Sequence, residues 1–175
     1  MENSRSDILL IGMPMSGKST IGKALSEKIK YAFNDMDSII EDRYKQTVSN
    51  IFETLGEEQY RLYEIECLRD LSGRDKFILS TGGGTINDKS IEISLSFKYR
   101  IWLQASIDEL IKRYLDEEEK RPLLYNTNNI KSFLTDMYSS REFFYMNCSN
   151  IVVNTTSRTI DQITNELIRK INELD

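Results

Sequence analysis

The segment GMPMSGKST has the spacing G-x-x-x-x-G-K-[ST] of a phosphate-binding loop, from Gly12 to Ser19. A short apolar run at residues 8–11 precedes it, and apolar residues at helical spacing follow it. In such a loop, backbone N–H groups and a helix N-terminus surround phosphate oxygens. Lys18 would reach the β- and γ-phosphates, and the Ser19 hydroxyl would bind Mg²⁺. The pattern therefore predicts a nucleoside triphosphate site.

Two further segments could bind the molecule that accepts a phosphoryl group. Asp35 and Asp37 follow a short predicted strand, and on an extended backbone their carboxylates point to opposite sides. One could serve a metal's hydration shell and the other a substrate hydroxyl; a helix N-cap with an acid in the first turn is the structural alternative. Residues 82–84 are three consecutive glycines, which favours a ligand lying against bare backbone over a plain turn.

Three arginines complete the set of residues suited to anions. Arg61 has Glu57 and Glu64 one helical turn away on either side, Arg121 lies in KRPLL, and Arg141 lies in SREFFY. The planar guanidinium group can bind a carboxylate or a phosphate through two hydrogen bonds. An ordinary surface ion pair is the alternative for each arginine taken singly.

The amino-acid composition excludes several kinds of catalytic site. The 175 residues contain no histidine, which excludes Ser-His-Asp and Cys-His nucleophiles, so catalysis must rest on carboxylates, Lys, Arg, backbone N–H groups or a metal.

Cys67 and Cys148 lack CxxC spacing and are expected as buried free thiols, without a disulfide or a zinc site. The net charge of −5 argues against a nucleic-acid surface. No apolar run approaches the roughly 20 residues of a membrane span, and no secretory signal precedes the first strand, so we expect a cytoplasmic protein.

Strands that alternate with helices must position these residues. Strands are expected at residues 8–11, 31–34, 76–80, 99–103 and 150–153, with helical periodicity between them. Capping boxes are expected at Ser106 with Glu109 and at Thr159 with Gln162. This order favours a single α/β domain over residues 1–175, with a parallel sheet covered on both faces and ligands at the carboxyl ends of the strands. The charged stretch 116–129 is either a solvated loop or a lid that carries Arg121 over a ligand.

Taken in order, the segments GMPMSGKST, FNDMD, IFETLGEEQYRLYE, STGGG, KRPLL and SREFFY resemble the shikimate kinase family over nearly the whole chain. The resemblance implies a P-loop three-layer α/β sandwich whose five-stranded parallel sheet has the order 2-3-1-4-5. It also implies a substrate-binding helical region over about residues 37–70 and a mobile lid over about residues 114–129. The implied reaction is transfer of the γ-phosphoryl group of ATP to the 3-hydroxyl of shikimate, with Mg²⁺, on the route to chorismate and the aromatic amino acids. The family is usually monomeric.

Carried over residue by residue, the resemblance implies a role for each part of the site. Lys18, Asp37 and Arg121 are the expected catalytic residues: Asp37 holds the attacking hydroxyl and accepts its proton, and Arg121 meets the transferring group. Ser19 and Asp35 are expected at the Mg²⁺. The expected nucleotide contacts are Gly12, Met15, Ser16, Gly17, Lys18, Ser19, Thr20, Arg113, Arg121 and Arg158. The expected shikimate contacts are Asp37, Phe52, Arg61, Gly82, Gly83, Gly84 and Arg141, with Arg61 and Arg141 on the carboxylate.

One position departs from the family pattern, and other functions share the P-loop. The family usually has glycine where this chain has Met15, so we expect altered packing beside the substrate and retained nucleotide binding. The alternatives are a gluconate kinase-like enzyme, a nucleoside monophosphate kinase, which needs a second phosphate site, and a non-catalytic nucleotide-binding regulator. Acceptor-dependent formation of ADP would exclude the regulator.

Overall fold

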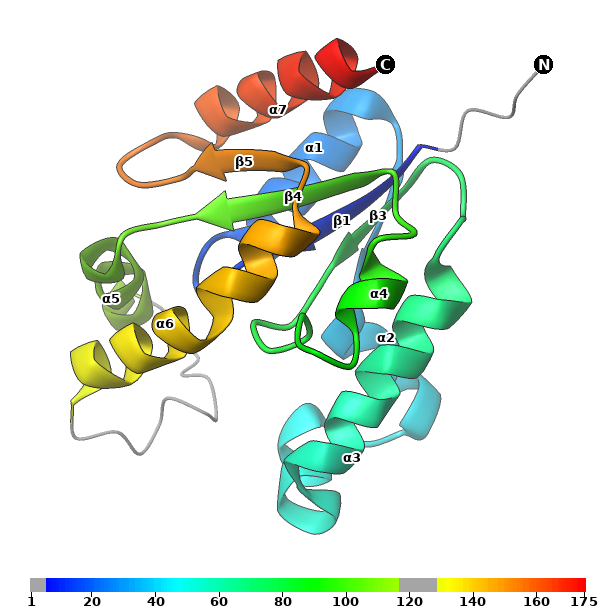
Figure 1. Ribbon diagram of the computed structural model, residues 1–175, viewed down its shortest axis with the longest axis vertical. Coiled ribbons are helices and arrows are strands. Elements are labelled where there is room, and N and C mark those ends of the chain that lie inside the picture. The colour runs from blue at the N-terminus through cyan, green and yellow to red at the C-terminus, as the bar shows by residue number, and fades with distance from the viewer. Residues whose placement is uncertain (1–5, 117–128) are drawn as a thin grey trace.

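The computed structural model describes residues 6–116 and 129–175 and contains a parallel sheet between two layers of helices (Figure 1). The strands are β1 (Asp7–Ile11), β2 (Ala32–Asp35), β3 (Phe77–Ser80), β4 (Tyr99–Gln104) and β5 (Ile151–Asn154). Neighbouring strands all pair in parallel, in the order β2-β3-β1-β4-β5. The predicted fold class and strand order are therefore confirmed, with each strand end within one residue of its expected position.

The helices are α1 (Lys18–Ile29), α2 (Met36–Tyr44), α3 (Val48–Leu71), α4 (Ile91–Ser94), α5 (Ile107–Asp116), α6 (Ile130–Cys148) and α7 (Ile160–Leu174). The capping box predicted at Thr159 and Gln162 is present at the start of α7. The second predicted box is only half formed. The Ser106 hydroxyl accepts from the Glu109 N–H, but the Ser106 N–H donates to Thr156, because the chain after β5 passes beside the start of α5.

Two apolar clusters, one on each face of the sheet, form the core. Ile8 and Leu10 of β1 pack with α1 and α7, whereas Leu9 and Ile11 pack with α3, α5 and α6. Successive side chains of a strand point to opposite faces of the sheet, so this one short strand contributes to the core on both faces. Each buried leucine or isoleucine side chain contributes roughly 1.5–3 kcal/mol relative to an exposed one.

Helices α2 and α3 occupy the region 37–70 that was expected to bind substrate. Gly56 interrupts α3 with φ 83° and ψ 168°, a conformation open to glycine, so the segment that carries Phe52 turns relative to the segment that carries Arg61. Of the predicted lid, residues 114–116 belong to α5 and residue 129 caps α6. Residues 117–128, with Arg121, lie outside the described residues.

Two smaller expectations concern the cysteines and membranes. Cys67 and Cys148 are both buried free thiols, as predicted. Within the two described ranges, no helix is long and apolar enough to cross a membrane.

A buried acid fixes the amino end of β1. The Asp7 carboxylate accepts from the Gly73 N–H at 3.0 Å and from the Lys98 N–H at 2.9 Å, which ties together the loops before β3 and β4. We expect Asp7→Ala to lower the free energy of unfolding by about 2 kcal/mol, since two backbone donors lose their acceptor. Asp7→Asn keeps one acceptor oxygen and should lose less. Urea unfolding measures both variants, and an alanine variant as stable as the parent would contradict this account.

Candidate active site

The phosphate-binding loop connects β1 to α1 at the carboxyl edge of the sheet. Gly12 has φ 142°, and a Cβ there would lie 2.5 Å from the Leu103 carbonyl oxygen, so no other residue fits against β4. Lys18 is only 7% exposed, and its Nζ donates to the carbonyls of Gly12 at 2.9 Å and Met13 at 2.8 Å. The ammonium group is thus held inside the turn of the loop.

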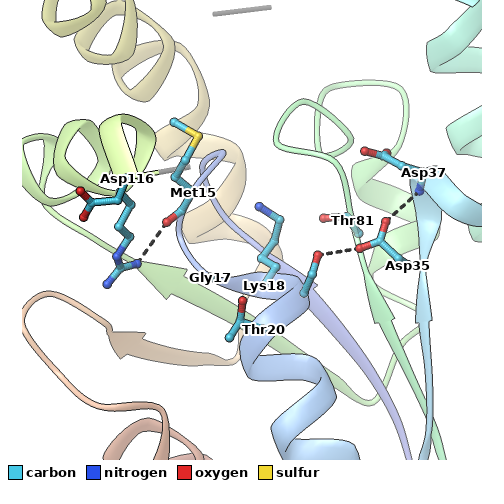
Figure 2. A pocket seen from close by; sticks show the side chains of 10 residues that line it. Met15, Gly17, Lys18, Thr20, Asp35, Asp37, Thr81 and Asp116 are labelled. Atoms are coloured by element: carbon cyan, nitrogen blue, oxygen red, sulfur yellow. Dashed lines mark hydrogen bonds between the residues drawn. The ribbon is translucent and has the colours of Figure 1, made fainter. Parts of the chain in front are cut away.

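A pocket of about 280 Å³ opens beside this loop (Figure 2). It brings together most of the residues expected at the nucleotide and the metal, and its lining is Met15, Gly17, Lys18, Ser19, Thr20, Asp35, Asp37, Thr81, Arg113 and Asp116. Three expected nucleotide residues in the described ranges, Gly12, Ser16 and Arg158, do not line it. Ser16 is buried within the loop, and Arg158 donates to the Asn154 carbonyl and pairs with Glu166 at 2.6 Å.

The two carboxylates after β2 have a different backbone from the one predicted. Asp35 ends the strand and is the N-cap of α2, and its Oδ1 accepts from the Asp37 N–H at 3.1 Å. Asp37 therefore lies in the first turn of a helix, and the extended arrangement was wrong. The N-cap alternative is confirmed, because Asp35 caps α2 with one oxygen, and its other oxygen accepts from the Ser19 hydroxyl at 2.6 Å (Figure 2). The roles of the two carboxylates at a metal and at a substrate hydroxyl stay predictions.

Met15 adopts φ 59°, the left-handed conformation that normally favours glycine. Its side chain is buried in the cluster that includes Ile11 and Leu110. Its carbonyl accepts from Arg113 at 3.1 Å, and Arg113 also donates to the Thr155 carbonyl at 2.8 Å. Buried apolar area and this hydrogen bond offset the backbone strain and fix the loop to α5.

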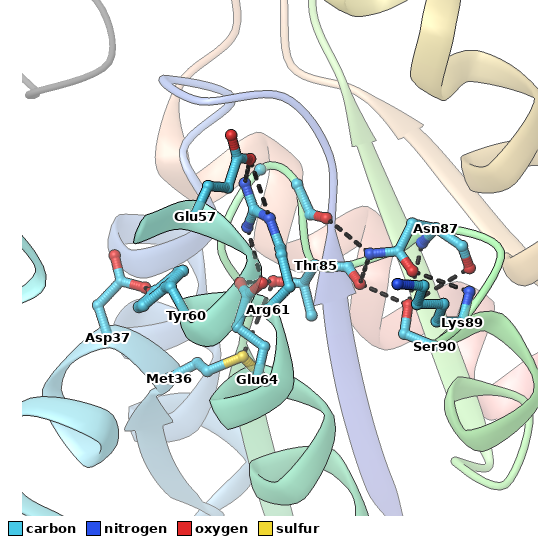
Figure 3. A network of polar contacts seen from close by, with 12 residues as sticks. Met36, Asp37, Glu57, Tyr60, Arg61, Glu64, Thr85, Asn87, Lys89 and Ser90 are labelled. Carbon is cyan, nitrogen blue, oxygen red and sulfur yellow. Dashed lines mark hydrogen bonds and ion pairs between the residues drawn. The ribbon is translucent and has the colours of Figure 1, made fainter. Parts of the chain in front are cut away.

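Arg61 and Glu64 lie on α3 after the Gly56 kink and form a partly buried ion pair of 2.7 Å (Figure 3). Glu64 is 1% exposed and also accepts from the Thr85 hydroxyl. Burial raises the pKa of Glu64, while Arg61 and Thr85 oppose that rise. Arg61 pairs on its other side with the exposed Glu57 at 2.7 Å. The alternative of an ordinary surface ion pair is therefore right for Arg61 with Glu57 and wrong for Arg61 with Glu64.

Close packing against neighbouring side chains explains the three glycines after β3. None of them has a positive φ among the described residues, so a special turn does not require them. A Cβ on Gly84 would lie 2.5 Å from Arg61 Nη2, one on Gly83 would lie 2.5 Å from the Pro14 ring, and one on Gly82 would lie 2.7 Å from a Glu64 oxygen. The bare backbone therefore lets the Arg61–Glu64 pair and the phosphate-binding loop approach the same loop.

Arg141 of α6 brings a second guanidinium group to this place. It lines a cavity of about 520 Å³ together with Arg61 and Gly84. Its Nη1 is buried and has no hydrogen-bond partner in the described part of the chain. Burial lowers the pKa of Arg141, and the positive charge of Arg61 lowers it further. Two close cations with an unused donor form a site that an anion would complete.

The remaining expected contact, Phe52, is partly buried, and its ring lies 4.9 Å from the Tyr60 ring. Sequence reasoning missed the contributions of Tyr60, Thr85 and Tyr145. Tyr145 donates to the Gly83 carbonyl at 2.5 Å, and burial raises its pKa to about 12. Its position four residues after Arg141 was a usable signal, because both then share a helix face. Nothing local in the sequence marked Thr85.

A phosphate-binding loop followed by a helix, on a parallel sheet of order 2-3-1-4-5 with a cavity lined by two arginines beside it, defines a P-loop phosphotransferase. A family model described as shikimate kinase matches residues 14–172. A shikimate kinase of Clostridium botulinum is 39% identical over 157 residues, 89% of each chain. One of Enterococcus faecalis is 34% identical and covers 95% of this chain and 98% of its own.

A solved structure of shikimate kinase from Acinetobacter baumannii in complex with shikimate superimposes with a TM-score of 0.90. It is 26% identical and covers 97% of this chain and 94% of its own. The chain belongs to the shikimate kinase family. Members of this family transfer a phosphoryl group from ATP to a hydroxyl of shikimate, so the predicted family and enzyme class are confirmed.

Met15 offers a test of how the loop is held. In Met15→Gly, loss of the buried side chain, about 2–4 kcal/mol, should outweigh relief of the left-handed strain, about 1–2 kcal/mol. We therefore expect lower thermal stability with unchanged ATP affinity. Met15→Leu keeps the volume and should unfold close to the parent. A glycine variant more stable than the parent would show that the side chain contributes little.

Proposed function

We propose that this chain transfers the γ-phosphoryl group of ATP to the 3-hydroxyl of shikimate, with the nucleotide beside Lys18 and the carboxylate of shikimate between Arg61 and Arg141. The observation that carries the acceptor assignment is the buried Nη1 of Arg141 next to Arg61, which has no hydrogen-bond partner within residues 6–116 and 129–175. A carboxylate accepts two hydrogen bonds from each guanidinium group and would supply the missing negative charge.

The nucleotide half rests on the loop and the start of α1. Lys18 would turn from the carbonyls of Gly12 and Met13 toward the β- and γ-phosphates, where its charge offsets that of the transferring group. Backbone N–H groups at the start of α1, from Gly17 to Thr20, would face the phosphates, and Arg113, which lines the same pocket, would border the base. Arg121, outside the described residues, and Arg158 remain proposed nucleotide contacts on the resemblance alone.

The fit of Mg²⁺ depends on the donor set beside Lys18. The Ser19 hydroxyl and the Asp35 carboxylate lie 2.6 Å apart and are both hard oxygen ligands. In the described part of the chain, no cluster of three or more acidic, Cys or His side chains could hold a metal alone. This suits Mg²⁺, which binds through one or two protein oxygens, substrate phosphates and water. When bound, it would draw negative charge from the phosphate oxygens.

The acceptor half places Asp37 between the two pockets. Asp37 lines the nucleotide pocket, and one of its oxygens lies 3.7 Å from the position of a Cβ on Gly82. A shikimate ring held by its carboxylate, against residues 82–84 and under Phe52, would present its 3-hydroxyl to Asp37. The hydroxyl oxygen then forms a bond to the γ-phosphorus, its proton passes to Asp37, and the bond from phosphorus to the leaving oxygen of ADP breaks.

The working form we propose is a monomer in the cytoplasm with one Mg²⁺ per active site. The family resemblance supports this form. Sedimentation at micromolar concentration would test the monomer.

We expect Arg141→Ala to raise the KM for shikimate by about 10- to 100-fold, because one charge-assisted contact to the carboxylate is lost. The KM for ATP should stay unchanged. Arg169→Ala, which removes an exposed arginine paired with Glu173, is the matched control. Steady-state kinetics with each substrate varied in turn will measure both constants. An unchanged shikimate KM would remove Arg141 from the site.

Lys18→Ala should lower kcat by about 10²- to 10³-fold, as expected for loss of a charge that stabilises the transition state. Circular dichroism should report a folded protein. Lys23→Ala, on the exposed side of α1, controls for loss of a lysine from this helix. Near-normal turnover in Lys18→Ala would refute the role of this lysine.

A further inference from the structure

Tyr145 of α6 binds the glycine loop after β3, one helical turn beyond Arg141. Its hydroxyl donates to the Gly83 carbonyl at 2.5 Å, and its side chain is fully buried. Burial raises the pKa of Tyr145 to about 12, although the positive charge of Arg141 opposes this rise. The hydroxyl therefore keeps its proton at neutral pH and remains a donor to the loop.

The ring of Tyr145 packs against the sheet. Its centroid lies 5.7 Å from that of Trp102 on β4. Tyr138, two helical turns earlier on α6, packs against the same tryptophan with 6.4 Å between ring centroids. The Tyr138 hydroxyl donates to Glu142 at 3.0 Å and accepts from Gln104 at 3.2 Å. Two tyrosines of α6 thus pack in a similar way, and the bond to the glycine loop comes from Tyr145.

The loop after β3 lies between α3 and α6 (Figure 1). A Cβ on Gly83 would lie 2.5 Å from the Pro14 ring, and a Cβ on the next residue would lie 2.5 Å from Arg61 Nη2. These are packing contacts, whereas the bond from Tyr145 fixes both a distance and a direction. The bond therefore sets the spacing between the loop beside Arg61 and the helix that carries Arg141.

We infer that Tyr145 is a positioning residue for the acceptor: its hydroxyl holds the glycine loop against α6, so that Arg61 and Arg141 face one carboxylate. This inference rests on the proposed function, because it assumes that the two arginines bind the carboxylate of shikimate. Charge-assisted hydrogen bonds depend on geometry, and a displacement of about 1 Å is enough to weaken them. Phenylalanine at this position would supply the ring packing without the donor.

The test compares Tyr145→Phe with the parent by titration calorimetry with shikimate and by steady-state kinetics. The ring stays against Trp102, and a melting curve is recorded first so that the assay temperature lies below the midpoint of unfolding. We expect the Kd and the KM for shikimate to rise by about 3- to 10-fold, as for loss of one neutral hydrogen bond. The KM for ATP should stay unchanged, since the contacts of Lys18 are kept.

A double-mutant cycle with Arg141→Ala separates positioning from general support of the fold. If Tyr145 acts by placing the two arginines, its hydroxyl has little effect once Arg141 is gone. In the Arg141→Ala background, Tyr145→Phe should therefore change the Kd for shikimate by less than about twofold. An equal factor in both backgrounds would overturn the inference. Tyr138→Phe, which removes the other hydroxyl beside Trp102, is the matched control and should leave the shikimate KM unchanged.

The outcomes distinguish this inference from the proposed function. If Arg141→Ala raises the shikimate KM and Tyr145→Phe does not, the inference about Tyr145 alone is wrong. A Tyr145→Phe variant that raises the KM for shikimate and for ATP by the same factor would also overturn it, because the loss would then be a general effect on structure. If Arg141→Ala leaves the shikimate KM unchanged, the proposed carboxylate site is wrong, and so is the role of Tyr145.

Discussion

A buried carboxylate, that of Glu64, determines the arrangement of the acceptor half of the site. A charge in the protein interior costs several kcal/mol unless close partners surround it, and Glu64 is paired with Arg61 and with the Thr85 hydroxyl. These partners come from α3 and from the loop after β3, so satisfying the charge fixes the helix against the loop. Glycines at positions 82 and 84 leave room for this pair, since a Cβ would lie 2.7 Å from a Glu64 oxygen at position 82 and 2.5 Å from Arg61 Nη2 at position 84.

The same edge of the sheet brings phosphate chemistry next to this pair. The phosphate-binding loop follows β1, Asp35 ends β2 and the glycines follow β3, and these three strands are neighbours in the order β2-β3-β1. Parallel strands end at one edge, so residues far apart in sequence meet there. Asp37 lies between the two halves, where it lines the nucleotide pocket and contacts Tyr60. Arg61 already has carboxylate partners, whereas Arg141 has a buried nitrogen with no hydrogen-bond partner among the described residues. This imbalance favours an anionic acceptor.

Much of this arrangement could be predicted from the sequence. Short apolar runs predicted the strands, and the glycine and lysine spacing from Gly12 to Ser19 predicted the phosphate-binding loop. The backbone at Asp35 and Asp37 could not be predicted correctly, because these residues are compatible both with the end of a strand and with the N-cap and first turn of a helix. The burial of Glu64 could not be predicted either, since the sequence spacing of an i, i+3 ion pair on a helix does not depend on whether a loop covers the pair. The contact from Tyr60 to Asp37 spans two helices and depends on the kink at Gly56, which no local pattern specifies.

The central claim is that two arginines bind the carboxylate of the acceptor while its hydroxyl meets the phosphoryl group. ADP release with ATP and Mg²⁺ should be measured with shikimate, with its methyl ester and without an acceptor. The ester keeps the ring and the 3-hydroxyl but removes the negative charge. The account predicts strong acceleration by shikimate and a kcat/KM for the ester lower by about 10²-fold or more, as expected for loss of a buried ion pair. Equal acceleration by the ester would contradict the claim, and the acceptor site would then have to lie away from Arg61 and Arg141.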